Sequence, residues 1–262
     1  MKFGLKVHHS DMDRLLDMRP EALEFALFAD DLDGSWVNDV KFDGPIVVHM
    51  PEKFKDGTLL DPASTDDKIR SDTVRVLKKT IDLSERLNAR RIIFHPGGIR
   101  RPAIYVDPDP LLKTMRELQA YAPKGIDLLL EDMPGIYWYA GVLYTSCLFK
   151  GQEEIIGILK ELNMGLCLDI CHAKLYCNGA GVDFPSYLKA LKPFTRHVHL
   201  SDARGSTDEG VQIGEGEIDF KGILPLLNDP EVIAVPEILD GHKNNGAGFK
   251  LALDRLKSLG YF

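Results

Sequence analysis

Six short apolar segments of the sequence each end on a side chain that can bind a metal ion. The segment GLCLDICHA begins at Gly165 and stays apolar until Asp169, and His172 follows three residues later. The complete set of segment ends is His49, His95, Glu131, Asp169, His199 and Glu237. Imidazole and carboxylate groups are common ligands of divalent metal ions. The recurrence therefore predicts a metal site, provided that the six segments lie side by side.

Strand-like and helix-like segments alternate along the whole sequence. Strands are expected at 2–7, 22–27, 45–50, 91–95, 126–131, 164–169, 196–200 and 232–237. Helical patterns are clearest at 67–87, 111–120, 153–162, 187–191 and 249–259. Eight β–α units in about 250 residues are typical of a (β/α)8 TIM barrel of the α/β class. A doubly wound open sheet is the alternative, but no glycine-rich phosphate-binding turn follows the first strand. No linker divides the chain, so we expect a single domain over residues 1–262.

The connections place the candidate ligands at one end of such a barrel. Helix-to-strand turns are short, whereas long strand-to-helix loops are expected at 50–64, 96–110, 132–150, 170–184 and 201–218. In TIM barrels these long loops build the C-terminal face, which carries the active site. The residues two positions before the ligands are expected to face inward one layer deeper, and they are Val47, Ile93, Leu129, Cys167, His197 and Val235. We expect no Lys or Arg from the strands among the carboxylates, which would then repel one another unless a cation neutralised them.

Charge and composition exclude several classes of partner. The 40 acidic residues exceed the 32 basic residues, and the net charge is −8. Proteins that bind nucleic-acid backbones are usually basic, so this balance argues against a nucleic-acid partner. No run approaches the ~18 apolar residues of a membrane helix, and no signal core precedes the first strand. Four cysteines without paired Cys-x-x-Cys motifs suit reduced thiols, so we expect a cytoplasmic location and no membrane partner.

Other histidines and cysteines lack the register of the six ligands. A lone histidine is more often a hydrogen-bonded structural residue than a ligand, and His8, His9 and His242 are interpreted as loop or rim residues. Cys167 shares the face of Asp169, but the cysteines show no spacing typical of a zinc–thiolate site.

Seven motifs resemble one family in their order. The segments VHMP, FHPGG, LLLEDMPG, GLCLDICHA, HVHLSDARG, IGEGEIDF and VPEI are similar to those of the xylose isomerase-like TIM barrels. This superfamily contains sugar isomerases and epimerases, inositol-pathway enzymes and apurinic endonucleases. The resemblance extends from about residue 45 to residue 240, and the Asp-x-x-His-Ala segment is among its most specific parts.

The isomerase-like members imply a metal-dependent reaction on a small-molecule carbohydrate. One divalent ion (Mn, Mg, Co or Zn) would be held by Glu131, Asp169, His199 and Glu237. Glu131 and Glu237 would exchange protons with a sugar, sugar phosphate or polyol through an enediolate. His49 and His95 would line the pocket or bind a second ion. The substrate would contact His172, Arg204, Asp208 and Trp138.

The endonuclease-like members imply a cluster of three zinc ions and phosphodiester cleavage. His49, His95 and a bridging Glu131 would hold one ion. A third ion would need His172 together with an Asp-x-His pair, but this sequence reads Asp208-Glu209-Gly210 at that place. Glycine offers no side-chain ligand, so the departure favours the isomerase or epimerase. A dehydratase-like lyase and a non-catalytic barrel that keeps its metal are further alternatives. The oligomeric state is left open, a homo-oligomer included.

Overall fold

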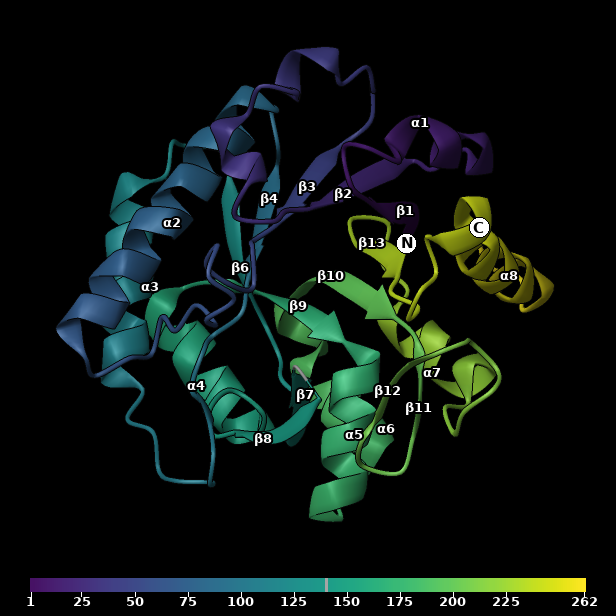
Figure 1. Cartoon of the computed structure of the whole chain (residues 1–262). Helices are drawn as coiled ribbons and strands as arrows, with labels where there is room; N and C mark the ends of the chain where they lie inside the picture. The colour runs from purple at the N-terminus through teal and green to yellow at the C-terminus, as the bar shows by residue number, and fades with distance from the viewer. Residues whose placement is uncertain (140) are drawn as a thin grey trace.

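A closed barrel of eight parallel strands forms the centre of the computed structural model (Figure 1). The structure describes residues 1–139 and 141–262. Around the barrel the strands follow the order β1 (Lys2–Val7), β13 (Ile233–Pro236), β10 (Thr195–Leu200), β9 (Gly165–Asp169), β6 (Asp127–Glu131), β4 (Arg91–Phe94), β3 (Ile46–His49) and β2 (Ala22–Ala26). The predicted (β/α)8 TIM barrel is confirmed, and the expected strands differ from these bounds by at most one residue at either end.

Helices surround the barrel on its outside (Figure 1). They are α1 (Met12–Leu15), α2 (Asp67–Arg86), α3 (Asp109–Tyr121), α4 (Gln152–Leu162), α5 (Ile170–Ala180), α6 (Phe184–Leu191), α7 (Phe220–Leu227) and α8 (Lys243–Ser258). Four short 3₁₀ turns are η1 (Leu16–Met18), η2 (Asp31–Asp33), η3 (Val37–Asp39) and η4 (Lys192–Phe194). The best-patterned helix, α2, begins where the Asp66 carboxylate accepts hydrogen bonds from two backbone N–H groups, and its apolar stripe is buried against the barrel. No helix in the described part of the chain is long and apolar enough to cross a membrane.

Four of the five expected long loops, 96–110, 132–150, 170–184 and 201–218, contain regular structure that the sequence pattern did not predict. Residues 170–180 form α5, not a loop, and the Asp169 carboxylate caps its first turn by accepting from the His172 N–H. Between β6 and α4, β7 (Ile136–Tyr139) and β8 (Val142–Ser146) form a hairpin that is extended by β5 (Ile99–Arg100). After β10, β11 (Asp202–Arg204) pairs with β12 (Asp208–Val211). These elements are added to the C-terminal face, so they shape the mouth of the barrel.

The inward-facing layer below the mouth is apolar, as the strand period predicts. Val47, Ile93, Leu129, Cys167 and Val235 lie in one buried cluster together with Ala22 and Ile233. His197 is fully buried at the same depth, which confirms the expectation that it lies below the ligand layer.

Candidate metal centre

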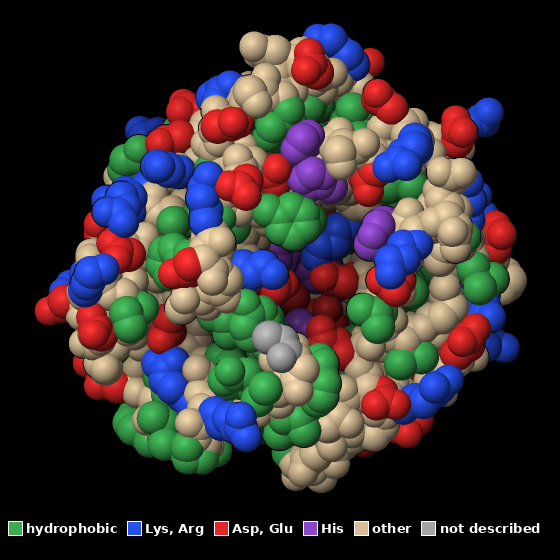
Figure 2. Space-filling model, viewed as in Figure 1, with side chains coloured by type: hydrophobic (Ala, Val, Ile, Leu, Met, Phe, Trp, Pro, Cys, Tyr) green, Lys and Arg blue, Asp and Glu red, His purple; other side chains and the backbone are tan. Residues whose placement is uncertain are grey.

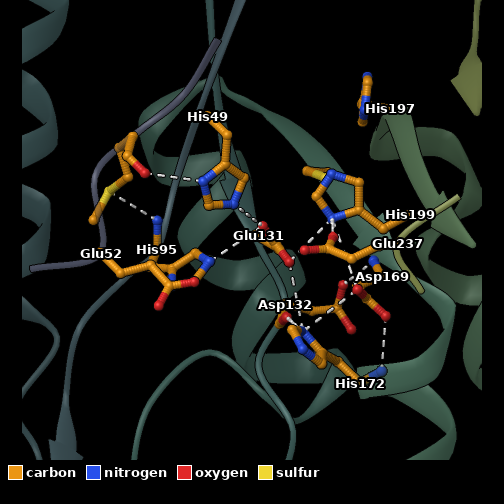
Figure 3. Close-up of polar contacts among 12 residues, drawn as sticks. His49, Glu52, His95, Glu131, Asp132, Asp169, His172, His197, His199 and Glu237 are labelled. Atoms are coloured by element: carbon orange, nitrogen blue, oxygen red, sulfur yellow. Dashed lines mark hydrogen bonds and ion pairs between the residues drawn. The ribbon is translucent and has the colours of Figure 1, made fainter. Parts of the chain in front are cut away.

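Two groups of metal-ligand side chains meet at the C-terminal end of the barrel (Figure 3). The first group is His49, His95 and Glu131, and the second is Glu131, Asp169, His199 and Glu237. Within each group, one ligand atom from every residue lies within 4.8 Å of the others. The structure therefore brings together all six side chains that the strand ends single out.

Glu131 belongs to both groups because its two oxygens face different partners. Its Oε2 atom lies 3.2 Å from His49 Nε2 and 3.4 Å from His95 Nε2. Its Oε1 atom lies 3.2 Å from His199 Nδ1. The carboxylate is buried at the end of β6, so its orientation is fixed by packing. This is the arrangement that a carboxylate needs in order to bridge two ions.

His199 shows how well the second group fits a cation. Its Nε2 atom lies 3.0 Å from Glu24 Oε2, so Nε2–H donates to Glu24 and leaves the Nδ1 lone pair directed at the cluster. The Nδ1 atom faces three carboxylates, at 2.7 Å from Glu237 Oε2, 3.2 Å from Glu131 Oε1 and 3.7 Å from Asp169 Oδ2. One nitrogen carries at most one hydrogen, so it cannot satisfy three acceptors. Glu237 Oε2 is buried and has no well-aligned hydrogen-bond partner within residues 1–139 and 141–262.

The donor set matches a divalent ion. Three carboxylates and one imidazole are ligands that Mn, Mg, Co and Zn ions accept in proteins. The first group is prepared in the same way, because His49 Nδ1–H donates to the Met50 carbonyl at 3.0 Å and leaves Nε2 free. Residues of both groups could therefore hold a metal ion.

The electrostatics of the cluster favour a positive charge. Burial raises the pKa of Glu131, but the facing His199 and His95 lower it further, so its pKa lies well below the usual range. Burial lowers the pKa of His95, but Glu131 raises it above its ordinary value. Burial also lowers the pKa of His199, and the surrounding acidic groups, Cys167 and Glu237 first, raise it well above normal. These shifts report a strongly negative site, which a divalent ion would neutralise more completely than protons on the imidazoles.

The expectation that no Lys or Arg from the strands enters the cluster is wrong. Lys6 on β1 forms an ion pair with Glu237 Oε1, and its Nζ atom lies 3.3 Å from Glu24 Oε1. Burial lowers the pKa of Lys6, but Glu237 and Glu24 raise it well above the usual value, so the ammonium stays charged. Lys6 therefore occupies one oxygen of Glu237 and leaves the other, Oε2, facing the ion site.

A thiolate site below the cluster is not supported. Cys167, His197 and His199 come within 4.8 Å of one another, but His199 Nε2 already donates to Glu24. Burial raises the pKa of the Cys167 thiol well above its ordinary value, and a thiol must lose its proton to bind zinc.

His172 lies beside the cluster and contacts a residue that the motif comparison did not single out. Its Nδ1–H donates to the Asp132 carbonyl at 2.8 Å, and its Nε2 atom lies 3.3 Å from Glu209 Oε1. Asp208 is exposed on β12, and Gly210 follows with a left-handed φ of 67°. Among the described residues, His172 joins no group of three ligand atoms within 4.8 Å.

A cavity of about 790 Å³ opens beside Glu237. Its lining includes Trp138, Leu143, Leu239 and Asp208, and the Trp138 side chain is 58% exposed. Figure 2 shows this face hollowed at its centre, with acidic side chains inside the hollow and hydrophobic side chains around it. Arg204 is not part of this lining, because its Nε–H donates to the Glu215 carbonyl at 2.8 Å.

Comparisons with known proteins agree with this fold. A family model described as xylose isomerase-like TIM barrel matches residues 35–259. An uncharacterized protein of Methanocaldococcus jannaschii is 32% identical over 195 residues, which cover 72% of this chain and 62% of that protein. A probable endonuclease 4 of Aquifex aeolicus is 26% identical over 216 residues, which cover 78% and 73% of the two chains. A solved structure described as a D-tagatose 3-epimerase-like protein has a TM-score of 0.73 and 26% identity, with 98% and 99% of the two chains covered.

Proposed function

We propose a function for this chain from one premise: the chain belongs to the xylose isomerase-like TIM barrel family. The proposed activity is the isomerisation or epimerisation of a sugar, sugar phosphate or polyol, dependent on a divalent metal ion. The observation that carries this proposal is the single His199 nitrogen that faces three carboxylates, two of them buried and the third, Glu237, half-buried, because this arrangement suits one cation at the bottom of an open mouth. Similarity to a solved D-tagatose 3-epimerase-like protein supports the choice of substrate class.

The four residues of the second group would hold the ion. When bound, a divalent ion would polarise a carbonyl and a neighbouring hydroxyl of the substrate, which acidifies the hydrogen on the adjacent carbon. Glu131 on β6 and Glu237 on β13 enter the cluster from different strands of the barrel. One of the two carboxylates would remove the proton, and the other would return a proton to the same carbon from the opposite face or to the neighbouring carbon.

Contacts within the cluster determine how the two glutamates can act. Burial raises the pKa of Glu237, but His199 and Lys6 lower it further, and the result is well below the usual range. Glu237 is therefore ionised and able to accept a proton, but an ion-paired carboxylate is a weak base. Proton transfer to Glu237 therefore requires substrate binding to weaken its contact with Lys6.

The cavity beside Glu237 supports a carbohydrate ligand. The exposed Trp138 ring could cover the apolar face of a sugar, and Leu143 and Leu239 extend that surface. The carboxylates of Asp208, Glu209 and Glu237 line the same cavity and can accept hydrogen bonds from hydroxyl groups.

The test is exchange of the substrate's α-hydrogen with deuterated solvent. Metal-loaded protein is incubated with a panel of ketoses, ketose phosphates and inososes. Glu131→Gln and Glu237→Gln keep size and an oxygen ligand but remove basicity, so each is expected to lower the exchange rate by about 10²–10⁴-fold. Glu161→Gln, on the exposed face of α4, is the matched control and should exchange at the native rate. Asp169→Asn should instead act mainly through loss of the metal.

Two results would contradict the proposal. If no member of the panel exchanges with metal-loaded wild-type protein, the proposed reaction is wrong. If a substrate is found and both glutamine variants exchange at the native rate, the acid–base roles of the two glutamates are wrong. A product lighter than the substrate by one water would favour a dehydratase-like lyase, since that reaction begins with the same proton removal.

A second candidate is cleavage of phosphodiesters at abasic sites in DNA. The observation in its favour is the pair of ligand groups that share Glu131, because two neighbouring ions can stabilise the attacking and the leaving oxygen of a displacement. Several relatives bear the name probable endonuclease 4. The incomplete set of ligands around His172 makes this the weaker candidate.

A further inference from the structure

A separate group of ligand side chains lies outside the central cluster. His8 and His9 follow β1 directly, and Asp31 begins the 3₁₀ turn η2 after β2. One ligand atom from each of the three residues lies within 4.8 Å of the other two. The sequence pattern gave these histidines no chemical role, because they lack the register of the strand-end ligands.

Both imidazoles point at one carboxylate. The Nε2 atom of His9 lies 3.0 Å from Asp31 Oδ1, and the Nε2 atom of His8 lies 3.2 Å from both Asp31 oxygens. Ligand atoms around a tetrahedral zinc ion with bonds of ~2.0–2.2 Å stand about 3.3–3.6 Å apart. The two nitrogen–oxygen separations would therefore widen by only a few tenths of an ångström to admit an ion, and the ligand atoms of the two imidazoles lie within 4.8 Å of each other.

The remaining polar atoms of two ligands already have partners that suit a bound ion. His8 Nδ1 lies 2.7 Å from Ser10 Oγ, which can accept a hydrogen from Nδ1 when Nε2 binds metal. Asp31 Oδ2 accepts from the Phe28 N–H at 2.6 Å, which leaves Oδ1 for the ion. The Ser10 N–H also donates to His8 Nδ1, at 3.3 Å, so metal binding at Nε2 requires Nδ1 to take up a hydrogen and donate it to Ser10 Oγ instead. Outer contacts of this kind orient the ligands of metal sites.

Trp36 packs against one side of this group, and the two imidazoles are partly exposed on the other. The Trp36 ring stacks on His9, with centroids 4.8 Å apart and an interplanar angle of 13°, and Trp36 Nε1–H donates to the Asp31 carbonyl. The Asp31 side chain is 8% exposed, whereas those of His8 and His9 are 23% and 29% exposed. The carboxylate is therefore desolvated, while the imidazoles leave room for a water molecule as a further ligand.

We propose that His8, His9 and Asp31 form a second, independent metal site that binds a divalent ion with a preference for imidazole, such as Zn²⁺. Two imidazoles and one carboxylate favour zinc and similar ions over Mg²⁺ or Ca²⁺, which prefer oxygen ligands only. His8 lies two residues after Lys6, so its Cα lies about 7 Å beyond that of Lys6 along the strand direction. The proposed ion is therefore at the rim of the barrel mouth. The site depends on no residue of the central cluster.

The experiment counts and locates zinc ions in the full-length chain. Protein stripped with a chelator is dialysed against Zn²⁺, and bound zinc is measured by elemental analysis for wild type and His8→Gln/His9→Gln. His242→Gln is the matched control, because His242 is an exposed histidine outside every ligand group of the described residues. Wild type and the control should each hold one equivalent more than the double variant.

Anomalous diffraction at the zinc edge of wild-type crystals locates the ion whether or not the variant folds well. A peak between the two Nε2 atoms and Asp31 Oδ1 is expected, and Asp169→Asn should keep this peak while it loses zinc from the central cluster. Absence of the peak in the wild-type protein, or equal zinc content in wild type and the double variant, overturns the proposal. Because zinc in the central cluster gives its own anomalous peak, absence of zinc at His8, His9 and Asp31 would not contradict the proposed function.

Discussion

Three histidines at the mouth of the barrel each commit one ring nitrogen to an acceptor within the protein. His199 Nε2–H donates to Glu24, His49 Nδ1–H donates to the Met50 carbonyl, and His172 Nδ1–H donates to the Asp132 carbonyl. In His199 and His49 the other nitrogen faces the cluster with its lone pair, whereas in His172 it faces Glu209 beside the cluster. The ligand atoms are thus selected by hydrogen bonds before any ion arrives, which lowers the cost of ordering them on binding.

Replacing Lys6 by a neutral residue tests how much its positive charge stabilises the cluster. Lys6→Met keeps the length of the side chain but leaves Glu24 and Glu237 without their cation. Removing one partner of a buried ion pair costs about 3–5 kcal/mol. We expect a decrease of this size in the free energy of unfolding of the metal-free protein and a much smaller decrease after metal is added, because the ion neutralises the same carboxylates.

Urea unfolding of both forms provides the measurement. Lys6→Arg, which keeps the charge, is the control and should lose less stability than Lys6→Met in the metal-free form. Equal stability of wild type and Lys6→Met without metal would show that the ion pair contributes nothing to the folded state.

Lys6 and Glu24 also mark what the sequence pattern could not reveal about the site. The strand-end register predicted six ligands because each of them closes an apolar segment. Lys6 and Glu24 instead lie within the first two strands, where they are register partners and face the barrel interior. A charged residue inside a short strand is usually assigned to the solvent face, and only the closed barrel shows that these two meet Glu237 and His199.

At the scale of elements, the loop after β10 is organised around one buried carboxylate. The Asp202 side chain accepts from four backbone N–H groups at 2.9–3.0 Å, those of Ala203, Gly214, Gly216 and Ile218. A Cβ atom at Gly216 would lie 2.3 Å from Asp202 Oδ1, so only glycine permits this approach. The same loop carries Asp208 and Glu209 to the mouth of the cavity.

Asp202→Ala is therefore expected to loosen the segment 202–218 while the barrel stays folded. Four backbone N–H groups would lose their acceptor, and each unsatisfied buried group costs about 1–3 kcal/mol, so the loop should open to water. Hydrogen–deuterium exchange should rise in residues 202–218, and KM for the substrate should increase. Asp183→Ala, which removes the cap of α6, is the control and should leave exchange in 202–218 unchanged. Identical exchange in the two variants would contradict the role of Asp202.

The elements that were predicted and those that were missed differ in the pattern of their buried side chains. Helix α2 has one buried stripe amid charged residues, so its sequence period predicts it directly. Helix α5 buries residues on several sides, because it lies between the barrel, α6 and the β11–β12 pair, so its sequence shows no clear stripe. The short strands β7 and β8 follow no buried alternation, because they form a hairpin above the mouth and only one residue in each of them is buried.

At the scale of the whole molecule, closure of the barrel joins the two ends of the chain at the site. Lys6 and Glu237 are separated by 231 positions, and β1 pairs with β13 to complete the ring. The ion site thus depends on the pairing of the last strand with the first, because only this pairing brings Glu237 next to Lys6. Binding of an ion to the folded barrel should stabilise the entire closed structure rather than a single loop.

The net charge and the ligand inventory both bear on the second candidate function. A charge of −8 opposes approach to a DNA backbone, especially at low salt. The position after Glu209 cannot easily regain an imidazole, because Gly210 has a left-handed φ and a Cβ there would lie 3.1 Å from Leu239. The backbone conformation of β12 therefore disfavours a side-chain ligand at position 210.

We accordingly expect no efficient incision of DNA at an abasic site, even with zinc fully loaded. An oligonucleotide with one abasic site, incubated with zinc-loaded wild-type protein and resolved on a denaturing gel, provides the measurement, and an authentic endonuclease 4 serves as positive control. Gly210→His should not create activity, since the left-handed backbone and the contact with Leu239 would direct the new side chain away from a productive position. Efficient incision by the wild-type protein, abolished by Glu131→Gln and by Asp208→Ala, would reverse the ranking of the two functions. It would mean that Glu209, 3.3 Å from His172, serves as the ligand that the missing histidine supplies elsewhere.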